Sequence, residues 1–379
     1  MARPRILHLH SSFGLGGKEA RAVQLMNAFG DMAEHAVVSA LPGEMSARDA
    51  IARGVAVDYP QAPPLSGLPS PARLFRLSRF MRGFDLVLTY NWGAFDAVMA
   101  RRLFGGSPLV HHEDGFNADE AERLLPRRSR YRRLALPAAH RLVVPSERLE
   151  RIARSEWHQK PPRLVRIPNG IPVSRYSAAL VAEAIPGFSR RAEEIVVGTV
   201  AGLRTVKNLP RLVRAFAAMD NTKARLVIVG TGPESERIAA EARRLGVADR
   251  VQMPGFLADP ARWIGLFDIF ALSSESEQFP ISLVEAMAAG LPAVATDVGD
   301  VAHMVSADNA PLIVAREDEA GFTAALDSLV SRADLRRAIG RANREKAAAC
   351  YDEGAMIASY ARLYGEAIGR PDAFSPRAS

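Results

Sequence analysis

The chain has 379 residues, of which 48% are hydrophobic and 24% are charged, and this length and composition predict a soluble globular protein with two domains. No apolar stretch approaches the roughly 20 residues that a transmembrane helix requires, and the first predicted strand begins too early to leave room for a signal peptide. The single cysteine, Cys350, excludes an internal disulfide and a cysteine-rich zinc site. We therefore expect a cytoplasmic protein.

The formal net charge of +7 is unevenly distributed along the chain. Residues 1–166 contain 25 lysine and arginine residues against 16 acidic ones, whereas the remainder contains 24 against 26. The excess is concentrated in residues 123–166, which hold 13 basic and three acidic residues. Such a stretch attracts an anionic membrane surface or another polyanion, at about 1 kcal/mol per basic residue near the headgroups. A solvated, arginine-rich helix face is the alternative interpretation.

The first half alternates short β-branched segments with longer segments of helical periodicity, which predicts βαβ units and a parallel sheet. The predicted strands are 5–10, 35–41, 55–59, 85–90, 108–113 and 141–145. The predicted helices are 18–29, 46–53, 70–81, 94–104 and 147–155.

The same pattern restarts after a segment of turn-forming and polar residues. The predicted strands are then 195–201, 225–230, 250–253, 268–272, 292–296 and 311–315. The predicted helices are 208–218, 233–245, 259–265, 281–289, 318–330, 333–348 and 353–368. The predicted organisation is an N-terminal Rossmann-like domain (1–172), a linker (173–193), a C-terminal Rossmann-like domain (194–350), a C-terminal helix that packs back on the first domain (351–369) and a tail (370–379).

Two doubly wound domains predict a cleft between them, and open parallel sheets bind ligands at the carboxyl ends of their strands. The loop after the first strand contains Gly16 and Gly17 directly before a predicted helix. Glycines let backbone N–H groups approach a ligand, and a helix N-terminus favours an anion such as a diphosphate. The loop lacks the spacing of a dinucleotide fingerprint or a Walker motif. A tight turn without a ligand is the alternative.

Four titratable side chains lie together at the end of another predicted strand: His111, His112, Glu113 and Asp114. Such a cluster suggests a catalytic site or a site that faces phosphate. Strand alternation places His111 and Glu113 on one side and the other two residues on the opposite side. A metal site and a set of polar helix caps are the alternatives. No second cluster of histidines and aspartates has the spacing of metal ligands, and we expect no metal.

Two cations, Arg204 and Lys207, follow the first predicted strand of the second half and precede a helix. A diphosphate would be neutralised there by both side chains and by the helix N-terminus. Two unrelated surface cations are the alternative.

The most informative segment lies between a later strand and the helix that follows it. Glu277 is predicted to lie on the loop, and Glu285 follows inside the helix, with seven residues between them. The exposed amides of Ile281 and Ser282 at the helix start are predicted to point at a ligand. One carboxylate suits sugar hydroxyls and the other suits a ribose diol.

Together these motifs resemble the retaining glycosyltransferases of family 4, which have the GT-B fold. The segments that carry the resemblance are 16–19, 167–170, 204–207 and 277–292. The last segment is the most specific, because the two glutamates are followed by Ala-Met-Ala-x-Gly-x-Pro. The resemblance implies an α/β protein with two facing, doubly wound Rossmann-like domains and a cleft between them.

The resemblance also implies roles for individual residues. Glu277 is implied to be a catalytic residue at the donor sugar, and Glu285 to bind the ribose. The other implied donor contacts are Gln278 and Phe279 at the sugar, and Pro254, Gly255 and Phe256 at the nucleobase. The contacts expected at the donor diphosphate are Gly16, Gly17, Arg204, Lys207, Ile281 and Ser282. The implied catalytic group of the N-terminal domain is one of His111, His112 and Asp114.

The implied reaction transfers a sugar from a nucleoside diphosphate sugar, a UDP or GDP sugar, with retention of configuration. The leaving diphosphate is stabilised electrostatically by the cations, so no metal or other cofactor is expected. The implied acceptor is a glycan, a lipid-linked molecule or a small molecule, and no nucleic-acid partner is expected. The basic N-terminal domain would hold the acceptor, at the surface of the inner membrane if residues 123–166 bind lipid. A nucleotide-sugar epimerase of the same fold and a non-catalytic sugar-binding protein are the competing hypotheses.

Overall fold

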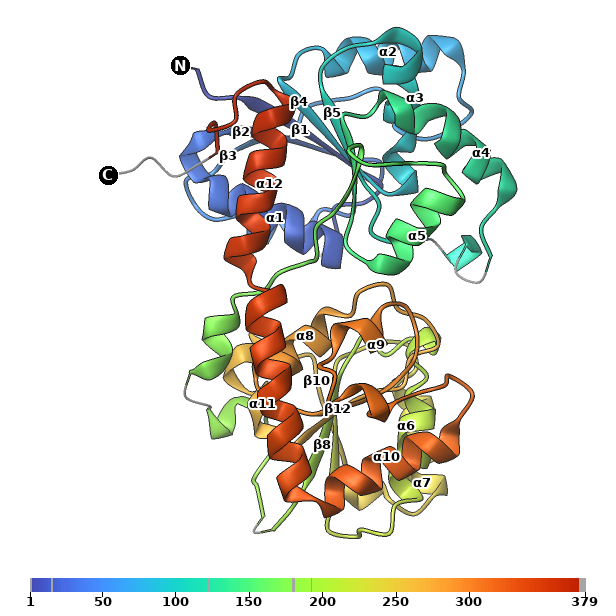
Figure 1. Ribbon diagram of the computed structural model, residues 1–379, viewed down its shortest axis with the longest axis vertical. Coiled ribbons are helices and arrows are strands. Elements are labelled where there is room, and N and C mark those ends of the chain that lie inside the picture. Colours follow the sequence, from blue (N-terminus) through green and yellow to red (C-terminus); the bar gives the residue numbers. More distant parts are fainter. Residues whose placement is uncertain are drawn as a thin grey trace. The chain divides into compact units, whose positions relative to one another are not determined.

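The computed structural model describes residues 2–14, 16–116, 118–120, 123–178, 181–191 and 193–374, so that residues 375–379 of the predicted tail lie outside the described residues. The chain divides into two compact units. The first unit comprises Met1–Asn169 and Gly354–Ser379, and the second unit comprises Gly170–Glu353. Each unit is built on one parallel sheet flanked by helices (Figure 1). The predicted α/β class with two doubly wound units is confirmed.

The sheet of the first unit has the strand order β3-β2-β1-β4-β5-β6-β7. Its strands are β1 (Arg5–His10), β2 (Glu34–Ser39), β3 (Ala56–Asp58), β4 (Leu86–Tyr90), β5 (Leu109–His112), β6 (Arg141–Val144) and β7 (Leu164–Arg166). Its helices are α1 (Gly17–Phe29), α2 (Pro71–Met81), α3 (Phe95–Phe104), α4 (Pro126–Ala135), α5 (Glu147–Ser155) and, from the end of the chain, α12 (Glu353–Ala367).

Two apolar clusters cover the two faces of this sheet. Strand alternation sends Ile6 to one face and Leu7 to the other. The face with Ile6 packs against α1 and α12, where the rings of Phe29 and Tyr364 meet edge-on. The opposite face packs against α2, α3 and α5 (Figure 1). The last helix of the chain therefore completes the core of the first unit.

The sheet of the second unit has the strand order β10-β9-β8-β11-β12-β13. Its strands are β8 (Val196–Val200), β9 (Arg225–Val229), β10 (Val251–Gly255), β11 (Ile269–Leu272), β12 (Ala293–Thr296) and β13 (Ile313–Val314). Its helices are α6 (Leu209–Ala217), α7 (Ser235–Arg244), α8 (Ile281–Ala288), α9 (Val301–Met304), α10 (Glu319–Ser331) and α11 (Ala333–Cys350).

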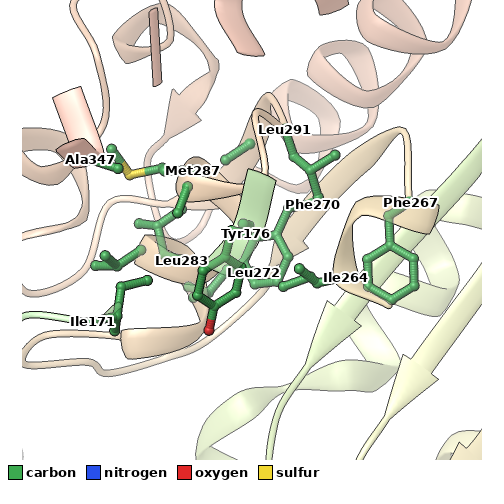
Figure 2. Close-up of a cluster of buried hydrophobic side chains, with 14 of the residues drawn as sticks. Ile171, Tyr176, Ile264, Phe267, Phe270, Leu272, Leu283, Met287, Leu291 and Ala347 are labelled. Atoms are coloured by element: carbon green, nitrogen blue, oxygen red, sulfur yellow. The ribbon is translucent and has the colours of Figure 1, made fainter. Parts of the chain in front are cut away.

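This second sheet is also covered by an apolar cluster on each face, because Val196 and Val197 point to opposite sides. One cluster packs against α6, α7 and α10. The other, shown in Figure 2, contains residues of α8 and also Ile171 and Tyr176, which precede the sheet in the sequence. Residues 173–178, which have the composition of a linker, thus contribute to the core of the second unit.

The structure differs from the predicted elements at five places. The predicted helix 46–53 is a short 3₁₀ turn, Ser46–Ala50, and the predicted helix 259–265 is two such turns that flank the buried Trp263. Helix α4, the four-residue helix α9 and strand β7 were not predicted. For α4 and β7 the reason lies in their pattern. Only three of the ten residues of α4 are buried, and β7 has three residues, so neither shows a clear apolar period.

The arginine-rich helix α4 is not a uniform solvated face. The guanidinium group of Arg132 is fully buried, lies 4.8 and 4.9 Å from two tryptophan rings, and pairs with Glu113 and Glu120 at 3.2 Å each. Arg127 and Arg130 are exposed. Helix α4 therefore contributes Arg132 to a buried ion cluster with a structural role and presents other arginines at the surface.

Candidate functional site at the carboxyl edges of the sheets

The sheet of the second unit reverses its direction of growth between β8 and β11. The chain leaves β8 toward β9 on one side and leaves β11 toward β12 on the other. In an open parallel sheet, such a reversal separates the two following loops and creates a crevice at the carboxyl ends of the strands. The loops after β8 and β11 meet there, since the Glu275 N–H donates to the Val206 carbonyl at 2.8 Å. These loops carry the predicted diphosphate and sugar contacts.

Arg204 and Lys207 lie on the loop after β8. Arg204 is exposed, and Lys207 is half-buried at the end of a 3₁₀ turn. The buried Leu203 anchors the loop, and its N–H donates a hydrogen bond of 2.9 Å to the loop after β9. A side chain cannot replace the hydrogen of Gly232, because a Cβ atom would lie 2.4 Å from the Leu203 carbonyl oxygen and the backbone φ is +158°. The close approach of two loops thus holds both cations at the crevice.

Glu277 lies on the loop after β11 and contacts Lys207 directly. The Lys207 Nζ atom lies 2.5 Å from Glu277 Oε1, and the Ser274 hydroxyl donates to the same oxygen at 2.7 Å. The Glu277 carbonyl packs against Gly299, where φ is +65° and a Cβ atom would lie 2.3 Å from that oxygen. The structure therefore brings together a predicted diphosphate contact and the predicted catalytic carboxylate.

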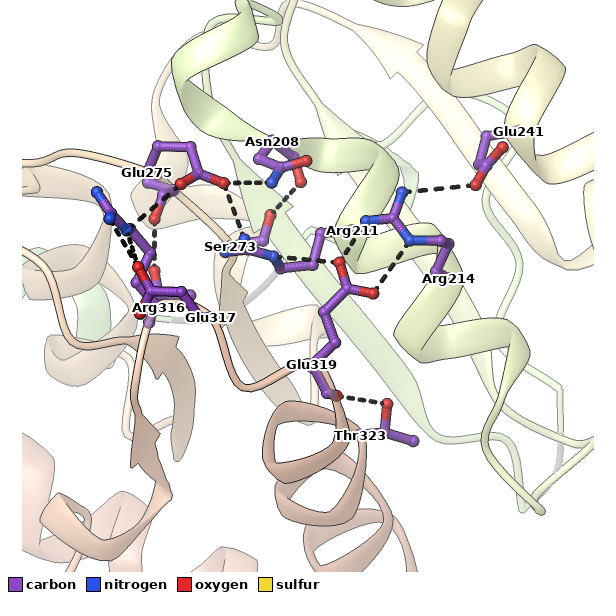
Figure 3. A network of polar contacts seen from close by, with 12 residues as sticks. Asn208, Arg211, Arg214, Glu241, Ser273, Glu275, Arg316, Glu317, Glu319 and Thr323 are labelled. Atoms are coloured by element: carbon purple, nitrogen blue, oxygen red, sulfur yellow. Dashed lines mark hydrogen bonds and ion pairs between the residues drawn. The ribbon is translucent and has the colours of Figure 1, made fainter.

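A polar network fixes these loops to two helices (Figure 3). Glu275 Oε1 accepts a hydrogen bond from Asn208 and pairs with Arg211 of α6 at 2.9 Å. Arg211 Nε also lies 3.5 Å from Glu319 of α10, to which Arg214 Nε donates at 3.1 Å. The carboxylate of Glu275 is thus bound by Asn208 and Arg211, whereas the carboxylate of Glu277, on the same loop, contacts Lys207.

The residues after Glu277 lead into α8. The Gln278 Oε1 atom is buried and has no hydrogen-bond partner among the described residues. The Phe279 ring meets the Tyr351 ring edge-on, with centroids 5.6 Å apart. Helix α8 begins at Ile281 without a side-chain cap in the described chain. The amides of Ile281 and Ser282 therefore form a helix N-terminus that carries partial positive charge.

Glu285 is the fifth residue of α8 and is half-buried. Its Oε1 atom accepts a hydrogen bond of 3.1 Å from the hydroxyl of Tyr176. Burial raises the pKa of Glu285 to about 7, although the hydrogen bond from Tyr176 acts to lower it. Sequence reasoning missed Tyr176, because the tyrosine lies in the segment 173–193 that was predicted to be a linker.

Pro254, Gly255 and Phe256, the predicted nucleobase contacts, lie at the carboxyl end of β10. The Gly255 carbonyl accepts a hydrogen bond of 2.8 Å from the Gly230 N–H after β9. The Phe256 side chain is 70% exposed, which leaves an aromatic face accessible for stacking. Strand β9 separates β10 from β8, so these three residues lie on the same edge as Lys207 but not beside it.

The sheet of the first unit reverses in the same way between β1 and β4. Gly16 is the N-cap of α1 and Gly17 is its first residue, and both are exposed at the carboxyl edge. Lys18 follows and is half-buried. Burial lowers the pKa of Lys18, although Asp114 and Glu44 act in the opposite direction. The predicted anion contacts thus lie at a helix N-terminus, as the sequence indicated.

His111 and His112 are buried at the end of β5. His111 Nδ1 lies 2.8 Å from the Thr89 hydroxyl, and its Nε2 lies 3.7 Å from Glu113, on the same side of the strand as predicted. His112 Nε2 lies 2.8 Å from the Tyr364 hydroxyl. Burial lowers the pKa of His112 well below its usual range, so the ring is neutral at pH 7. Both histidines form part of the interior of the first unit.

Asp114 lies on the loop after β5. Its carboxylate pairs with both terminal nitrogens of Arg21, one of them at 2.9 Å. Arg21 also donates to Asn169 Oδ1 at 3.0 Å, and the Asp114 N–H donates to Asn91 Oδ1 at 2.7 Å. Asp114 is therefore held by Arg21 of α1 and by Asn91 of the loop after β4, and Arg21 is itself bound by Asn169.

Membrane spans and metal sites are absent from the described parts of the chain. No helix there is long and apolar enough to cross a bilayer. No group of three or more histidine, cysteine, aspartate or glutamate side chains there is arranged to hold a metal ion.

Two family descriptions match the chain and together cover most of it. "Glycosyltransferase Family 4" matches residues 15–175, and "Glycosyl transferases group 1" matches residues 182–346. The chain belongs to the family 4 glycosyltransferases. The second match contains the crevice of the second unit, and the first contains most of the first unit.

Two curated relatives are similar to this chain in sequence, and a solved structure is similar to it in fold. The N-acetyl-alpha-D-glucosaminyl L-malate synthase of Bacillus anthracis is 28% identical over 47% of this chain and 46% of its own length. The D-inositol 3-phosphate glycosyltransferase of Mycobacterium marinum is 27% identical over 83% of this chain and 74% of its own length. The crystal structure of Anabaena HepE in complex with UDP is 19% identical and superimposes with a TM-score of 0.77, over 96% of this chain and 100% of HepE. This likeness shows that the glycosyltransferase has the GT-B fold.

Proposed function

We propose that this glycosyltransferase binds a nucleoside diphosphate sugar at the carboxyl edge of the second unit and transfers the sugar with retention of configuration. The observation that carries the proposal is the 2.5 Å contact between Lys207 and Glu277 at the reversal of the sheet. In such a donor the sugar is attached directly to the diphosphate. A site that binds both the diphosphate and the sugar must therefore place a cation next to a group that accepts hydrogen bonds from sugar hydroxyls. Lys207 and Glu277 meet this requirement.

The diphosphate would be bound from three directions. Arg204 and Lys207 supply two cations, and the amides of Ile281 and Ser282 supply a helix N-terminus. In the free protein Lys207 is neutralised by Glu277, so that an arriving diphosphate competes with that carboxylate for the ammonium group. The cations and the helix N-terminus would stabilise the leaving diphosphate without a divalent metal.

The sugar would lie beside Glu277, Gln278 and Phe279. The buried Gln278 Oε1, unpaired among the described residues, is an acceptor available to a ligand hydroxyl. The negative charge of Glu277 favours the positive charge that develops on the sugar as the bond to the phosphate breaks. Glu277 is therefore the proposed catalytic residue, and the acceptor hydroxyl attacks from the face that the diphosphate leaves.

The nucleoside would extend from the diphosphate along the same edge. Glu285 is the proposed ribose contact, and Pro254, Gly255 and Phe256 are the proposed nucleobase contacts. The exposed ring of Phe256 offers a stacking surface for a base. UDP is the first nucleotide to test, since the solved complex of HepE contains UDP.

The first unit would bind the acceptor. Of the three proposed catalytic groups there, Asp114 lies on a loop at the carboxyl edge, whereas His111 and His112 are buried and would act through their hydrogen bonds. Gly16 and Gly17 offer a second helix N-terminus for an anion. An anionic acceptor suits the basic first 166 residues, and the names of two relatives designate acceptors with anionic groups, L-malate and D-inositol 3-phosphate.

A lipid-linked acceptor would also explain the exposed arginines of α4, which we propose to contact an anionic membrane surface on the cytoplasmic side. Arg127 and Arg130 are the exposed residues that would make this contact. The buried Arg132 would take no part in it.

A panel of nucleoside diphosphate sugars tests the donor proposal directly. The full-length protein is expected to gain thermal stability with one donor class, by mass action, in the presence of EDTA. With an anionic acceptor it is expected to form a product with a new glycosidic bond of the donor's anomeric configuration. Stabilisation that EDTA abolishes and magnesium restores would contradict the proposed role of Arg204 and Lys207. Epimerised donor without transfer would identify an epimerase instead.

A further inference from the structure

Tyr176 and Glu285 connect two segments that are 109 residues apart in the sequence. The tyrosine ring is buried in the apolar cluster beside Leu283 and Leu272 (Figure 2). Its hydroxyl reaches Glu285 Oε1 at 3.1 Å, and the phenol is the donor because an ionised carboxylate only accepts. Among the described residues, Tyr176 is the one hydrogen-bond partner of this carboxylate.

Tyr176 is held in place on both sides. It lies in a short 3₁₀ turn, Val173–Ser177. Before the turn, the Ile171 N–H donates to the carbonyl that follows α11, at 2.9 Å. Within the turn, Arg175 binds both carboxylate oxygens of Asp259 at 2.9 Å. The hydroxyl group is thus presented to α8 by an ordered segment rather than by a loose linker.

We propose that the Tyr176 hydroxyl positions the Glu285 carboxylate for the ribose of the donor nucleotide. This inference rests on the proposed function, in which Glu285 binds that ribose. A glutamate side chain has several staggered rotamers, and a hydrogen bond from a buried phenol selects one of them before the ligand arrives. The lone pairs that Tyr176 does not use then remain for ribose hydroxyl donors.

The same hydrogen bond influences the charge of Glu285. Burial raises the pKa of this carboxyl to about 7, and the Tyr176 hydroxyl acts against that rise. Burial and Glu285 itself raise the pKa of Tyr176, so the phenol keeps its proton near neutral pH. A carboxylate accepts a ribose hydrogen bond more strongly than a carboxylic acid does. Nucleotide binding should therefore weaken as the pH falls through about 7.

The other charged groups around Glu285 are few. On the side of the 3₁₀ turn, Arg175 and Asp259 neutralise each other. On α11, Arg344 donates to the Ala289 carbonyl at the end of α8, and Lys346 donates to two backbone carbonyls near α9. The adjoining β11, β12 and Ile264–Leu266 contain no charged residue. Among the residues that the structure describes, the hydroxyl of Tyr176 is thus the polar group that acts on this carboxylate.

Two tyrosine variants separate this role from packing. Tyr176→Phe removes the hydroxyl and keeps the buried ring. Tyr351→Phe is the matched control, because both tyrosines lie in the second unit and are 7% exposed, and the Tyr351 hydroxyl bonds a backbone carbonyl, that of Met304, at 3.3 Å. Glu285→Gln and the double variant with Tyr176→Phe complete the set.

The measurement is the Kd of the full-length proteins for UDP and for GDP between pH 6 and pH 8.5. At pH 7, Tyr176→Phe is expected to bind the preferred nucleotide about three- to tenfold more weakly than Tyr351→Phe, the effect of one ordinary hydrogen bond, because the hydroxyl acts on the nucleotide only through Glu285. The loss of affinity on acidification should also begin at a higher pH. The phosphates of the nucleotide titrate in the same way with both variants, so comparison with Tyr351→Phe removes their contribution to the pH dependence of Kd. With a donor sugar, KM should rise while kcat changes little.

Tyr176→Phe should have no further effect in the Glu285→Gln background, because the hydroxyl acts through that carboxylate. Equal affinities and pH profiles for Tyr176→Phe and Tyr351→Phe would overturn the inference and leave the proposed function standing. An undiminished effect in the double variant would also overturn it. If the parent protein binds neither nucleotide, the proposed function fails and the inference fails with it. Melting curves without ligand verify that each variant is folded.

Discussion

The carboxyl edges of the two sheets hold different kinds of side chains. In the second unit, the edge carries Lys207 and Glu277, which are in contact and only partly buried, and the exposed Arg204. In the first unit, the strand ends carry buried rings, such as His10 stacked on Tyr90 at 4.0 Å. Burial lowers the pKa of His10 well below its usual range, so this ring is neutral. The edge of the second unit keeps charged side chains accessible, whereas the edge of the first unit combines buried, neutral rings with the Arg21–Asp114 ion pair.

This difference shows how one architecture supports two tasks. A donor with a diphosphate needs cations that water and ligand can reach, and these lie on loops of the second unit. The first unit has fewer accessible groups at the equivalent place, so its contribution is concentrated on Asp114 and the N-terminus of α1. The charges of the first unit that are buried, above all Arg132, hold its loops. Three predictions test this division.

The largest effect is expected from Arg132→Met. It removes the buried arginine that pairs with Glu113 and leaves Glu120 with Arg128 alone, and breaking a buried ion pair in this way costs about 3–5 kcal/mol. The first unit should unfold at a lower temperature, whereas nucleotide affinity measured below that temperature should be unchanged. Arg130→Met on the same helix is the control, because Arg130 is exposed and its loss should change stability by less than about 0.5 kcal/mol. A large loss of nucleotide affinity in Arg132→Met would break the comparison.

The second effect concerns Glu285 and the stability of the free protein. The pKa of Glu285 is about 7 in the folded state, against a reference value of 4.5. The folded state therefore binds the proton more tightly, and stability falls as the pH rises from about 4.5 to about 7. Glu285→Gln removes this penalty and should stabilise the free protein by up to about 3 kcal/mol at pH 8, and by little at pH 5.

The same variant should bind the nucleotide more weakly, by about 1.5–3 kcal/mol, since a charged hydrogen bond is lost. Thermal unfolding across this pH range, with and without nucleotide, gives both numbers. A Glu285→Gln protein that is less stable than its parent at pH 8 would show that burial of the ionised carboxylate does not lower the free energy of unfolding. The second unit would then not differ from the first by a buried carboxyl group with a raised pKa.

The smallest effect is expected at the membrane. Arg127→Glu combined with Arg130→Glu should weaken binding to anionic vesicles by about tenfold or more, because each basic residue contributes about 1 kcal/mol. Raised salt should release the parent protein. The matched control reverses the exposed Arg337 and Arg341 of α11, with the same change in net charge. Equal binding to neutral vesicles, or equal losses in both variants, would contradict a membrane surface on α4.

Much of the fold could be predicted from the sequence because the parallel strands are continuous apolar segments. Strand β1 has the predicted bounds, and α5 begins and ends where the periodicity indicated. The residues that meet at the crevice were predicted because each lies in a short loop directly after a strand. Their contact, Lys207 with Glu277, follows from strand order, which no local pattern contains.

The parts that the sequence did not indicate depend on contacts between distant segments. Tyr176 lies in a polar stretch, and its relation to Glu285 appears only when that stretch packs on α8. The buried Arg132 was counted with its exposed neighbours because composition does not distinguish them. Likewise, nothing local shows that His111 and His112 are inside the first unit and Asp114 is on a loop.

The central claim is that the accessible charges of the second unit perform the chemistry, and Glu277→Gln tests it most directly. The substitution keeps the size of the side chain and removes its charge, so turnover should fall by about 100-fold or more if the electrostatic contribution resembles that of an oxyanion-hole donor. Affinity for the free nucleotide, which lacks the sugar, should not fall, because Lys207 then no longer pairs with a competing carboxylate. Glu275→Gln, two residues earlier and bound into the network with α6, should lose much less activity. Full transferase activity in Glu277→Gln, with a product of unchanged configuration, would contradict the account.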